Sequence, residues 1–500
     1  MSDPKSDELT PGADVEVTPA EVTPADGAAS ADGAPAPATN DVPARDEPGA
    51  DAEEAAEPEP VVVPIRRQSI VLRSGACDMR VGPGVADQLG QATKSVAGKP
   101  GHTLLVAGDD VSGELVERLR RSLVDVGFSV TVREVPSGRE SRKLAHAMRL
   151  YDELAAAGVT PDDPVVVVGD ADVLSLVLFA AATWQTGSPV VSVPTTLDGM
   201  VDVPVTPRAI DSASMPESLR TRANLRFSLC DTDLLPTATD DPTTLMAYAV
   251  LVAGAVAAGE SAFSDLAVRA DGIVSADAAT LVNEILDITK ARTRVASSTA
   301  LAMRQGILYG LSVGRALGAC LAEQDDKGGQ LAVEREVCEG RLLAEGLRIS
   351  ARLAAARQAP DQAVVDLVFA QDGLLEKLGL PEVACNVDPE RLLEALRVDE
   401  FAHSNRFMPA LPLGFGRVRL CSVEDETLLA HLSGWCRARR KLARRLARQA
   451  EEAAVADTSA LGGAAGDAAA PEAPAAGDAA APETPAAENA DAPAGSTATK

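Results

Sequence analysis

Residues 163–170, DPVVVVGD, place four consecutive valines between acidic residues, and this short apolar run decides the fold class. Similar runs recur on both sides, at HTLLVAGDD (102–110), SVTVREV (129–135) and SPVVSVPTT (188–196). The stretches between them have the apolar spacing of helices, at 111–127, 141–158 and 174–187. Buried strands that alternate with helices are typical of a parallel sheet with crossover helices. We therefore predict an α/β domain over residues 69–238.

Polar and small residues follow the apolar runs at the points where the predicted strands end. Ligands of open parallel sheets bind outside the carboxyl ends of the strands. Asp109, Gly169, Thr195 and Thr196 occupy such positions. The sequence therefore predicts that these four residues lie on one rim of the sheet.

Strand signals nearly vanish beyond residue 240, where long Ala, Leu and Arg segments have helical spacing. We predict a helical domain over 239–450, with one short hairpin in ALPLGFGRVRLCSV (410–423). Near its end, WCRARRKLARRLARQAEEAA (435–454) reads as a strongly basic helix. Such a helix is either a solvated terminal helix or a surface for nucleic acid or an anionic membrane, although only Trp435 could serve as an aromatic platform.

The two ends of the chain differ from its body in composition. Residues 1–60 hold 16 acidic and 2 basic side chains, and residues 451–500 hold 9 acidic side chains and one Lys, among Ala, Pro and Gly. Such segments bury too little apolar surface to offset the entropy of ordering, so 1–65 and 451–500 are predicted to be disordered. The net charge is −28 for the chain but −6 for residues 61–450, so the body gives no general argument for nucleic acid binding.

Cysteine use and hydropathy indicate the compartment. The seven cysteines are scattered singly without a CxxC pair, which is typical of reduced core residues. No apolar stretch is long enough to cross a bilayer, and no basic segment followed by an apolar run begins the chain. We expect a cytoplasmic protein with no membrane partner.

The segment from residue 135 to 202 carries a family resemblance, in the helix FAAAT, the strand VPTTL and the VD that follows. It resembles the 3-dehydroquinate synthase family, sugar-phosphate cyclases that bind NAD in an α/β domain and a metal ion in a helical one. The likeness continues through DTDLLPT (231–237), RQGILYGLSVGRA (304–316) and EGRLLAEGL (339–347), and spans about 69–425. It implies a lyase of the shikimate pathway, in aromatic amino acid biosynthesis, and a homodimer.

Several residues match cofactor positions of that family. Glu140 and Lys143 match an acid and a lysine that contact the NAD ribose and phosphate region, and a carboxylate with an ammonium suits those groups. Thr195 and Thr196 match a threonine pair that holds the cofactor, and Thr237 matches another threonine on that side. The alternatives are an exposed charge pair at a helix start and capping at strand ends.

Three further residues match substrate positions. Asp202 matches an aspartate near the substrate, Arg208 stands where the family has a lysine that holds anionic groups, and Arg304 matches a substrate-binding arginine. Arginines in a cleft suit a small anionic or phosphorylated ligand, because they bind its oxygens in pairs. The alternative for each is an ordinary surface arginine.

The glycine-rich turn after the third strand departs from the family pattern. In the family this turn lets backbone amides approach the pyrophosphate, but here it reads GDADVLS (169–175) and keeps only Gly169. Asp170 and Asp172 put carboxylates where a phosphate would lie, and Ser175 replaces an aspartate. These changes count against NAD binding.

The metal positions depart further. The glutamate ligand of the family matches Tyr248, with Leu251 in place of a nearby lysine. Its two histidine ligands match Leu311 and Glu339, and a further active-site histidine matches Arg315. Leucine does not coordinate a divalent ion and tyrosine rarely does, so no metal site is predicted. The four histidines of the chain lie elsewhere and are expected to be structural or surface residues: His102, His146, His403 and His431.

The sequence therefore predicts an α/β domain of dinucleotide-binding type followed by an all-α domain, as in 3-dehydroquinate synthases. We expect a divergent member that has lost its metal chemistry and retains nucleotide or anion binding. An active synthase with an atypical site and a non-catalytic interaction protein remain alternatives.

Overall fold

The computed structural model describes residues 63–222, 224–326, 338–357 and 361–463, which belong to one compact unit, Val62–Lys500. The segments predicted to be disordered lie largely outside the described residues. The last helix, predicted from the sequence over 435–454, continues to Gly463, into the tail that the sequence predicted to be disordered from residue 451. Its alanines have a high helix propensity.

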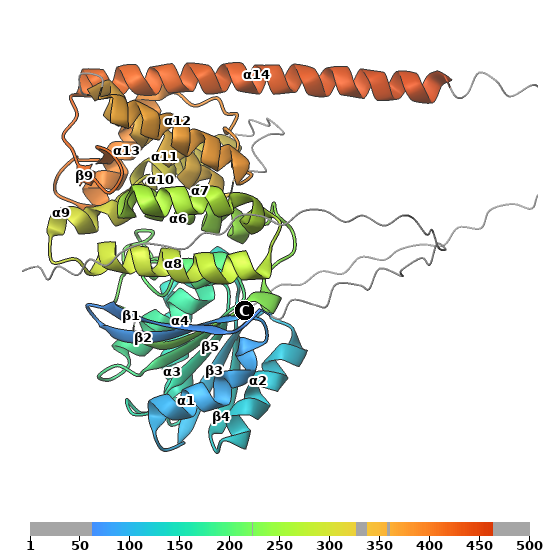
Figure 1. Cartoon of the computed structure of the whole chain (residues 1–500), viewed down its shortest axis with the longest axis vertical. Coiled ribbons are helices and arrows are strands. Elements are labelled where there is room, and N and C mark those ends of the chain that lie inside the picture. The colour runs from blue at the N-terminus through green and yellow to red at the C-terminus, as the bar shows by residue number, and fades with distance from the viewer. Residues whose placement is uncertain (1–62, 223, 327–337, 358–360, 464–500) are drawn as a thin grey trace, which may run out of the picture. The chain divides into compact units, whose positions relative to one another are not determined.

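A seven-stranded sheet forms the N-terminal half, in the order β1-β2-β7-β6-β5-β3-β4 (Figure 1). Its strands are β1 (Arg66–Leu72), β2 (Gly75–Gly82), β3 (His102–Gly108), β4 (Ser129–Val135), β5 (Val165–Gly169), β6 (Val190–Pro194) and β7 (Leu225–Asp231). The hairpin β1–β2 is antiparallel, and the pairs from β2 to β4 are parallel. The predicted α/β domain is confirmed.

The four strands named from the sequence are β3, β4, β5 and β6. The other three were missed. In β2, GACDMRVG, and β7, LRFSLCD, charged residues interrupt the apolar runs, and both strands are fixed by pairing with each other across about 150 residues of chain. Pairing between distant segments leaves no local signal.

Helices cover both faces of the sheet. They are η1 (Val85–Gln88), α1 (Leu89–Ala97), α2 (Gly113–Asp125), η2 (Gly138–Arg142), α3 (Leu144–Ala156), α4 (Ala171–Thr183) and α5 (Leu197–Val201). Alternate residues of each strand face opposite sides. Leu105 and Val166 pack in a core with α1 and α2, whereas Leu104 and Val165 pack in a core with α3 and α4.

The helical half begins at Pro242. It contains α6 (Pro242–Ala258), α7 (Glu260–Val274), α8 (Ala278–Ser297), α9 (Leu301–Arg304), α10 (Leu311–Asp326), α11 (Glu339–Arg357), α12 (Gln362–Lys377), α13 (Pro389–His403) and α14 (Asp425–Gly463). Shorter elements are η3 (Thr232–Leu234), η4 (Gln305–Leu308), and the hairpin β8 (Ala410–Pro412) with β9 (Val418–Leu420), which was predicted. The order of an α/β domain followed by a helical domain is confirmed.

The two halves share a core. Helix α6, apolar on all sides, packs with α8 in the same cluster of buried residues as the α3–α4 face of the sheet. Helix α8 also contacts β1, where Gln68 Nε2 donates to Leu286 O at 3.0 Å. The sheet edge therefore fixes the helical half in place, and with it any cavity between the two.

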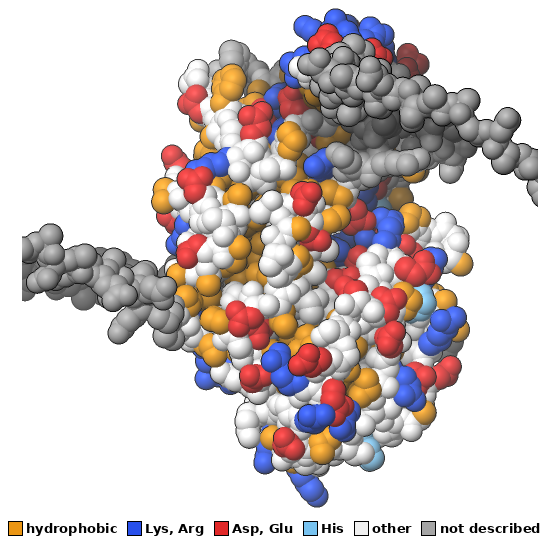
Figure 2. All heavy atoms as spheres, turned by 90° about the vertical axis from the view of Figure 1, so that its right-hand side faces the viewer, with side chains coloured by type: hydrophobic (Ala, Val, Ile, Leu, Met, Phe, Trp, Pro, Cys, Tyr) orange, Lys and Arg blue, Asp and Glu red, His pale blue; other side chains and the backbone are white. Residues whose placement is uncertain are grey.

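Helix α14 closes the far side of the helical half. Its Trp435 Nε1 donates to Glu345 Oε2 at 3.0 Å, and Arg439 Nη2 donates to the same oxygen at 3.0 Å. The basic side chains beyond Arg439 are mostly exposed, and Figure 2 shows them gathered at the top of the molecule. The structure therefore anchors the first part of this helix and leaves its basic end in solvent.

The cysteines agree with the prediction of reduced core residues. All seven cysteines are free, and all but Cys338, which is half-buried, are buried. Within the parts of the chain that the structure describes, no helix has both the length and the apolarity needed to cross a membrane.

Candidate functional site

A cavity of about 910 Å³ lies between the α/β half and the helical half. Its wall combines apolar side chains from α6, α10 and α11 with seven arginines and five carboxylates. The arginines are Arg139, Arg142, Arg208, Arg220, Arg292, Arg315 and Arg391; the carboxylates are Asp202, Glu217, Glu323, Glu339 and Asp399. Of the predicted catalytic residues, Asp202 and Arg208 line this cavity and Arg304 does not.

Arg142 and Arg208 form the charged floor on the α/β side. The side chain of Arg142 is 3% exposed, and its Nε lies 2.9 Å from Asp172 Oδ1. Arg208 reaches the same oxygen at 2.8 Å and Asp198 Oδ2 at 2.5 Å. Burial raises the pKa of Asp198 to about 6, although Arg208 opposes this shift. Arg142, missed by the sequence reasoning, is as central to the cavity as Arg208.

Glu339, at the position of a histidine ligand in the family, lies at the start of α11. Its Oε1 accepts from Arg142 Nη2 at 2.6 Å and from Arg139 Nη1 at 2.7 Å. Burial tends to raise its pKa, but the charges of Arg142, Arg208 and Arg139 outweigh burial and hold the pKa below its usual value. This carboxylate is committed to neutralising arginines.

The other metal positions present no strong ligand. Leu311 lines the cavity. Tyr248 lies outside it, 3% exposed in the core, where its hydroxyl is 3.5 Å from Ile273 O. The side chains that α6 does turn towards the cavity are small or apolar: Met246, Val250, Ala253 and Ala257.

Arg315, at the position of the further histidine, is also paired. Its Nε donates to Asp399 Oδ1 at 2.7 Å and its Nη2 to Asp399 Oδ2 at 2.9 Å, a two-point contact. Among the described residues, no cluster of three or more His, Cys, Asp or Glu side chains could hold a metal ion. The residues at this site therefore do not fit the divalent ion of the family.

Asp202 is held by an arginine that the sequence reasoning did not identify. Arg292 Nη2 donates to Asp202 Oδ1 at 2.6 Å and to Thr206 Oγ1 at 2.6 Å. Arg292 is 5% exposed in α8 and lines the cavity. The only sequence signal that could have indicated Arg292 is its place on the buried face of a helix.

Arg304 turns to the backbone of its own loop. Its Nη1 donates to Ser298 O at 2.7 Å and to Thr299 O at 3.2 Å. Arg304, which was predicted to bind substrate, therefore donates to backbone carbonyls at the C-terminus of α8.

Glu140 and Lys143 lie side by side on the surface, both more than half exposed. Lys143 Nζ lies 2.7 Å from Glu140 Oε1 and 2.6 Å from Oε2. The hydrogen bond from Lys143 lowers the pKa of Glu140. In this structure the two predicted cofactor residues satisfy each other.

The three predicted threonines differ in their contacts. Thr196 caps α5, with its Oγ1 3.4 Å from Gly199 N. The backbone N of Thr195 donates to Gly169 O at 2.9 Å, which joins the ends of β6 and β5. Thr237 is exposed in the turn before α6.

Asp109 and Gly169 lie at the ends of β3 and β5, as predicted. Asp109 Oδ1 accepts from Ser137 N at 2.8 Å. Gly169 has φ +152°, and a Cβ there would lie 3.0 Å from Val173 Cγ1. The rim is therefore closely packed at the glycine that the family pattern retains.

The side chain of Asp170 caps the N-terminus of α4. Its Oδ1 accepts from the backbone N of Asp172 and of Val173, both at 2.8 Å, and its Oδ2 accepts from Gly138 N at 2.5 Å. These amides are the donors that a phosphate would use at a helix N-terminus. The residues present do not fit a dinucleotide pyrophosphate at this turn.

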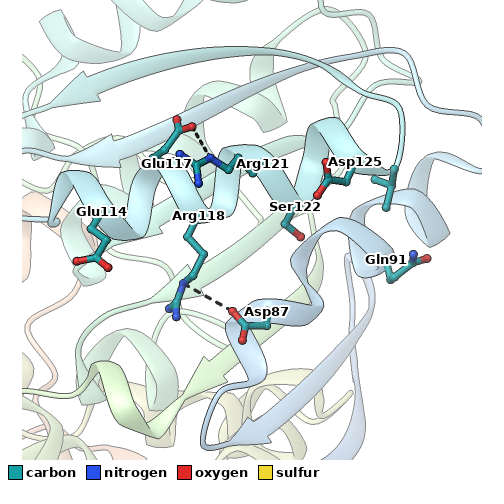
Figure 3. Close-up of a pocket in the computed structure, with 9 residues that line it drawn as sticks. Asp87, Gln91, Glu114, Glu117, Arg118, Arg121, Ser122 and Asp125 are labelled. Carbon is teal, nitrogen blue, oxygen red and sulfur yellow. Dashed lines mark hydrogen bonds and ion pairs between the residues drawn. The ribbon is translucent and has the colours of Figure 1, made fainter.

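A second cavity, of about 760 Å³, lies on the surface between α1 and α2 (Figure 3). Its charged side chains pair with each other, Arg118 with Asp87 at 3.6 Å and Arg121 with Glu117 at 2.8 Å. None of the predicted site residues lines it. The cavity between the halves is therefore the candidate functional site.

Comparison with known proteins agrees with the residue resemblance. A family model described as 3-dehydroquinate synthase N-terminal matches residues 132–244. The 3-dehydroquinate synthase of Pelobacter propionicus is 28% identical over 368 residues, which cover 73% of this chain and 98% of that relative. The 3-dehydroquinate synthase of Caulobacter vibrioides is 29% identical over 330 residues, 65% of this chain and 85% of that relative.

Solved structures agree on the fold. A 2-deoxy-scyllo-inosose synthase in complex with carbaglucose-6-phosphate, NAD+ and Co2+ aligns with a TM-score of 0.58 at 17% identity, over 73% of this chain and 99% of that one. The 2-epi-5-epi-valiolone synthase of Streptomyces hygroscopicus, with NAD+ and Zn2+ bound, aligns with a TM-score of 0.59 at 18% identity, over 72% and 96%. By sequence the chain is therefore similar to 3-dehydroquinate synthases, and it shares the fold of the two synthases whose structures align with it.

Proposed function

We propose that this chain is a sugar-phosphate cyclase relative that has lost metal binding and cyclase turnover, and that its cavity binds a small anionic ligand. The observation that carries the proposal is the state of Glu339. The family resemblance implies metal ligands at Tyr248, Leu311 and Glu339. Of these three residues only Glu339 has a carboxylate, and it accepts from Arg139 and Arg142 at 2.7 and 2.6 Å. A divalent cation would have to displace both guanidinium groups.

The charge of the cavity wall supports the loss of metal binding. Each of the five carboxylates of the wall pairs with one of its arginines, which leaves no free carboxylate cluster for a cation among the described residues of the wall. Leu311 and Val250 add no donor atoms, and the described residues of the wall include one histidine, His403. Without a metal ion, the site lacks the Lewis acid that polarises the reacting oxygens in the family's reaction.

The same wall favours an anion. Arginine binds carboxylate and phosphate through paired N–H groups, and the apolar side chains of α6 and α10 cover the remaining surface. Arg220 is held loosely, because its side chain is 48% exposed and its Nη2 lies 3.7 Å from Glu217 Oε2. A small ligand with an anionic group and an apolar body suits this combination.

The decisive experiment measures metal content and turnover in the full chain. After dialysis against zinc or cobalt, we expect far less than one equivalent of metal per chain. Phosphate release from the family's phosphorylated substrate, with NAD and either metal added, should not exceed the rate without protein. The Pelobacter propionicus relative, assayed in parallel, is the positive control. Turnover by this chain at an ordinary enzymatic rate would show that it is an active synthase.

Ligand binding is tested separately by thermal unfolding with anionic sugars, carboxylates and inorganic phosphate. We expect at least one of these classes to raise the unfolding temperature. If none does, the cavity has no anion-binding role and the chain is better explained as an interaction protein.

A further inference from the structure

The order of the strands locates a crevice at the ends of β3 and β5. From β3 the chain adds β4 on one side of the sheet, and then β5 on the other side. Open sheets bind their ligands where the strand order reverses, outside the carboxyl ends of the two strands. In this chain that point lies between Gly108 and Gly169, beside the start of α4.

The chain supplies its own anion at this point. Asp170, 6% exposed, accepts from two amides of the first turn of α4 and from Gly138 N in the loop after β4. Its carboxylate therefore connects β5, α4 and the β4–η2 loop. A bound phosphate at a helix N-terminus makes the same kind of contact with backbone amides.

The surroundings of Asp170 are unfavourable for further negative charge. Asp109 and Asp110 bind Ser137 from the end of β3, and Asp172 follows Asp170 on α4. Burial raises the pKa of Asp170, and the charges of Asp172 and Asp110 contribute to that rise. A pyrophosphate would add negative charge to a group of four carboxylates.

Space is also limited. A Cβ on Gly108 would lie 2.6 Å from Ser137 Oγ, and a Cβ on Gly169 would lie 3.0 Å from Val173 Cγ1. The backbone around the crevice is already in contact with side chains. Any phosphate would have to take the volume that the Asp170 carboxylate occupies.

We propose that Asp170 substitutes for a ligand phosphate, so that the crevice is closed to dinucleotides, and that removing its carboxylate opens an anion site there. This inference is separate from the anion proposed for the cavity between the halves, because Asp170 is not part of that cavity wall. Failure of one proposal would leave the other standing.

The test compares Asp170→Gly and Asp170→Ser with the wild type in the full chain. Calorimetric titration with NAD should give no saturable binding to the wild type up to about 1 mM. Asp170→Gly should unfold about 1–3 °C below the wild type, because three backbone amides lose their acceptor in a large folded body. Millimolar pyrophosphate should recover most of that loss in Asp170→Gly and should leave the wild-type midpoint unchanged.

Asp388→Gly is the matched control. Asp388 also caps a helix, accepting from the backbone N of Glu390 and of Arg391, both at 3.1 Å, but it is exposed and has no third amide donor. Its loss should lower the midpoint without creating a response to pyrophosphate.

Three results would overturn the proposal. They are saturable NAD binding to the wild type at micromolar concentration, an equal pyrophosphate response in Asp388→Gly, and a folded Asp170→Gly that ignores pyrophosphate. If Asp170→Gly does not fold, Asp170→Ser decides, because serine keeps a helix cap but removes the charge and most of the volume of the side chain. In that variant pyrophosphate should raise the midpoint, and no rise would count against the proposal.

Discussion

The cavity between the halves and the crevice beside α4 are the two places where the family resemblance predicts bound groups, and they have changed in opposite ways. The cavity keeps a volume of about 910 Å³ but replaces the expected metal ligands with Leu311 and an arginine-bound Glu339. The crevice keeps its strands and helix but is filled by Asp170. One site is an open cavity lined by paired charges, and the other is filled by a side chain of the chain itself.

The comparison teaches that the fold and the chemistry of its sites depend on different residues. The sheet and helices depend on buried apolar residues, which neither change disturbs. The site depends on a few polar side chains, each of which can change without loss of the core. Four predictions test the stability and the ligand binding of these regions, in order from the largest expected effect to the smallest.

Replacing Arg142 with alanine should have the largest effect. Arg142 is 3% exposed and lies within 3 Å of both Asp172 and Glu339, so its removal leaves Asp172 with Arg208 and Glu339 with Arg139 and takes a buried hydrogen-bonding partner from each. We expect the free energy of unfolding to fall by about 2–3 kcal/mol. Urea denaturation measures this change.

The control is Arg139→Ala, which removes another partner of Glu339. Arg139 is 55% exposed, so its loss should cost less than about 1 kcal/mol. Equal costs for the two variants would show that the charged floor of the cavity is not a buried network.

The pH dependence of stability should separate two carboxylates of this network. Burial raises the pKa of Asp198 to about 6 from 3.8, so the folded state holds a proton that the unfolded state has lost between those values. Asp198 therefore lowers stability as the pH rises from about 4 to 6. In Asp198→Asn this decline should disappear, as measured by denaturation at each pH.

Glu339 should act in the opposite direction. Its pKa lies below 4.5 because of Arg142, Arg208 and Arg139, so its contribution to stability is present above that pH and is lost as the pH falls. Glu339→Gln should therefore reduce the loss of stability in acid. The same slope in both variants would contradict the assignment of the two groups.

Arg220→Ala should weaken anion binding with little loss of stability. Arg220 is 48% exposed and its ion pair with Glu217 spans 3.7 Å, so it is available to a ligand. We expect affinity for inorganic phosphate, measured by calorimetry, to fall about tenfold, equivalent to about 1.4 kcal/mol. Unchanged affinity, with Arg121→Ala as the distant surface control, would place any anion site elsewhere.

Glu140→Ala should have the smallest effect. Glu140 and Lys143 form an exposed pair three residues apart, which is worth about 0.2–0.5 kcal/mol. The unfolding temperature should therefore fall by less in Glu140→Ala than in Arg142→Ala. A loss comparable to that of Arg142→Ala would show that the predicted cofactor rim has a structural role beyond this pair.

The sequence predicted much of the fold but less of the site. The runs that became β3, β5 and β6 were identified because each is apolar along most of its length, and β4 because its apolar residues alternate with polar ones. Asp202 and Arg208 were identified through the resemblance, and both line the cavity. Arg142 was missed although it lies between the matched Glu140 and Lys143, and Arg292 was missed because it stands in a helical segment without a motif.

By itself the sequence determined the strands β3 to β6 with the helices between them, the helical second half of the chain and the carboxylates in the turn after β5. These follow from local patterns and from residue identity. Only the tertiary structure decided that Arg142 meets Glu339, 197 positions away, and that Asp170 turns inward onto three amides. The physical reason is that a buried charge selects its partners by proximity in the folded state, and proximity is not written in local sequence.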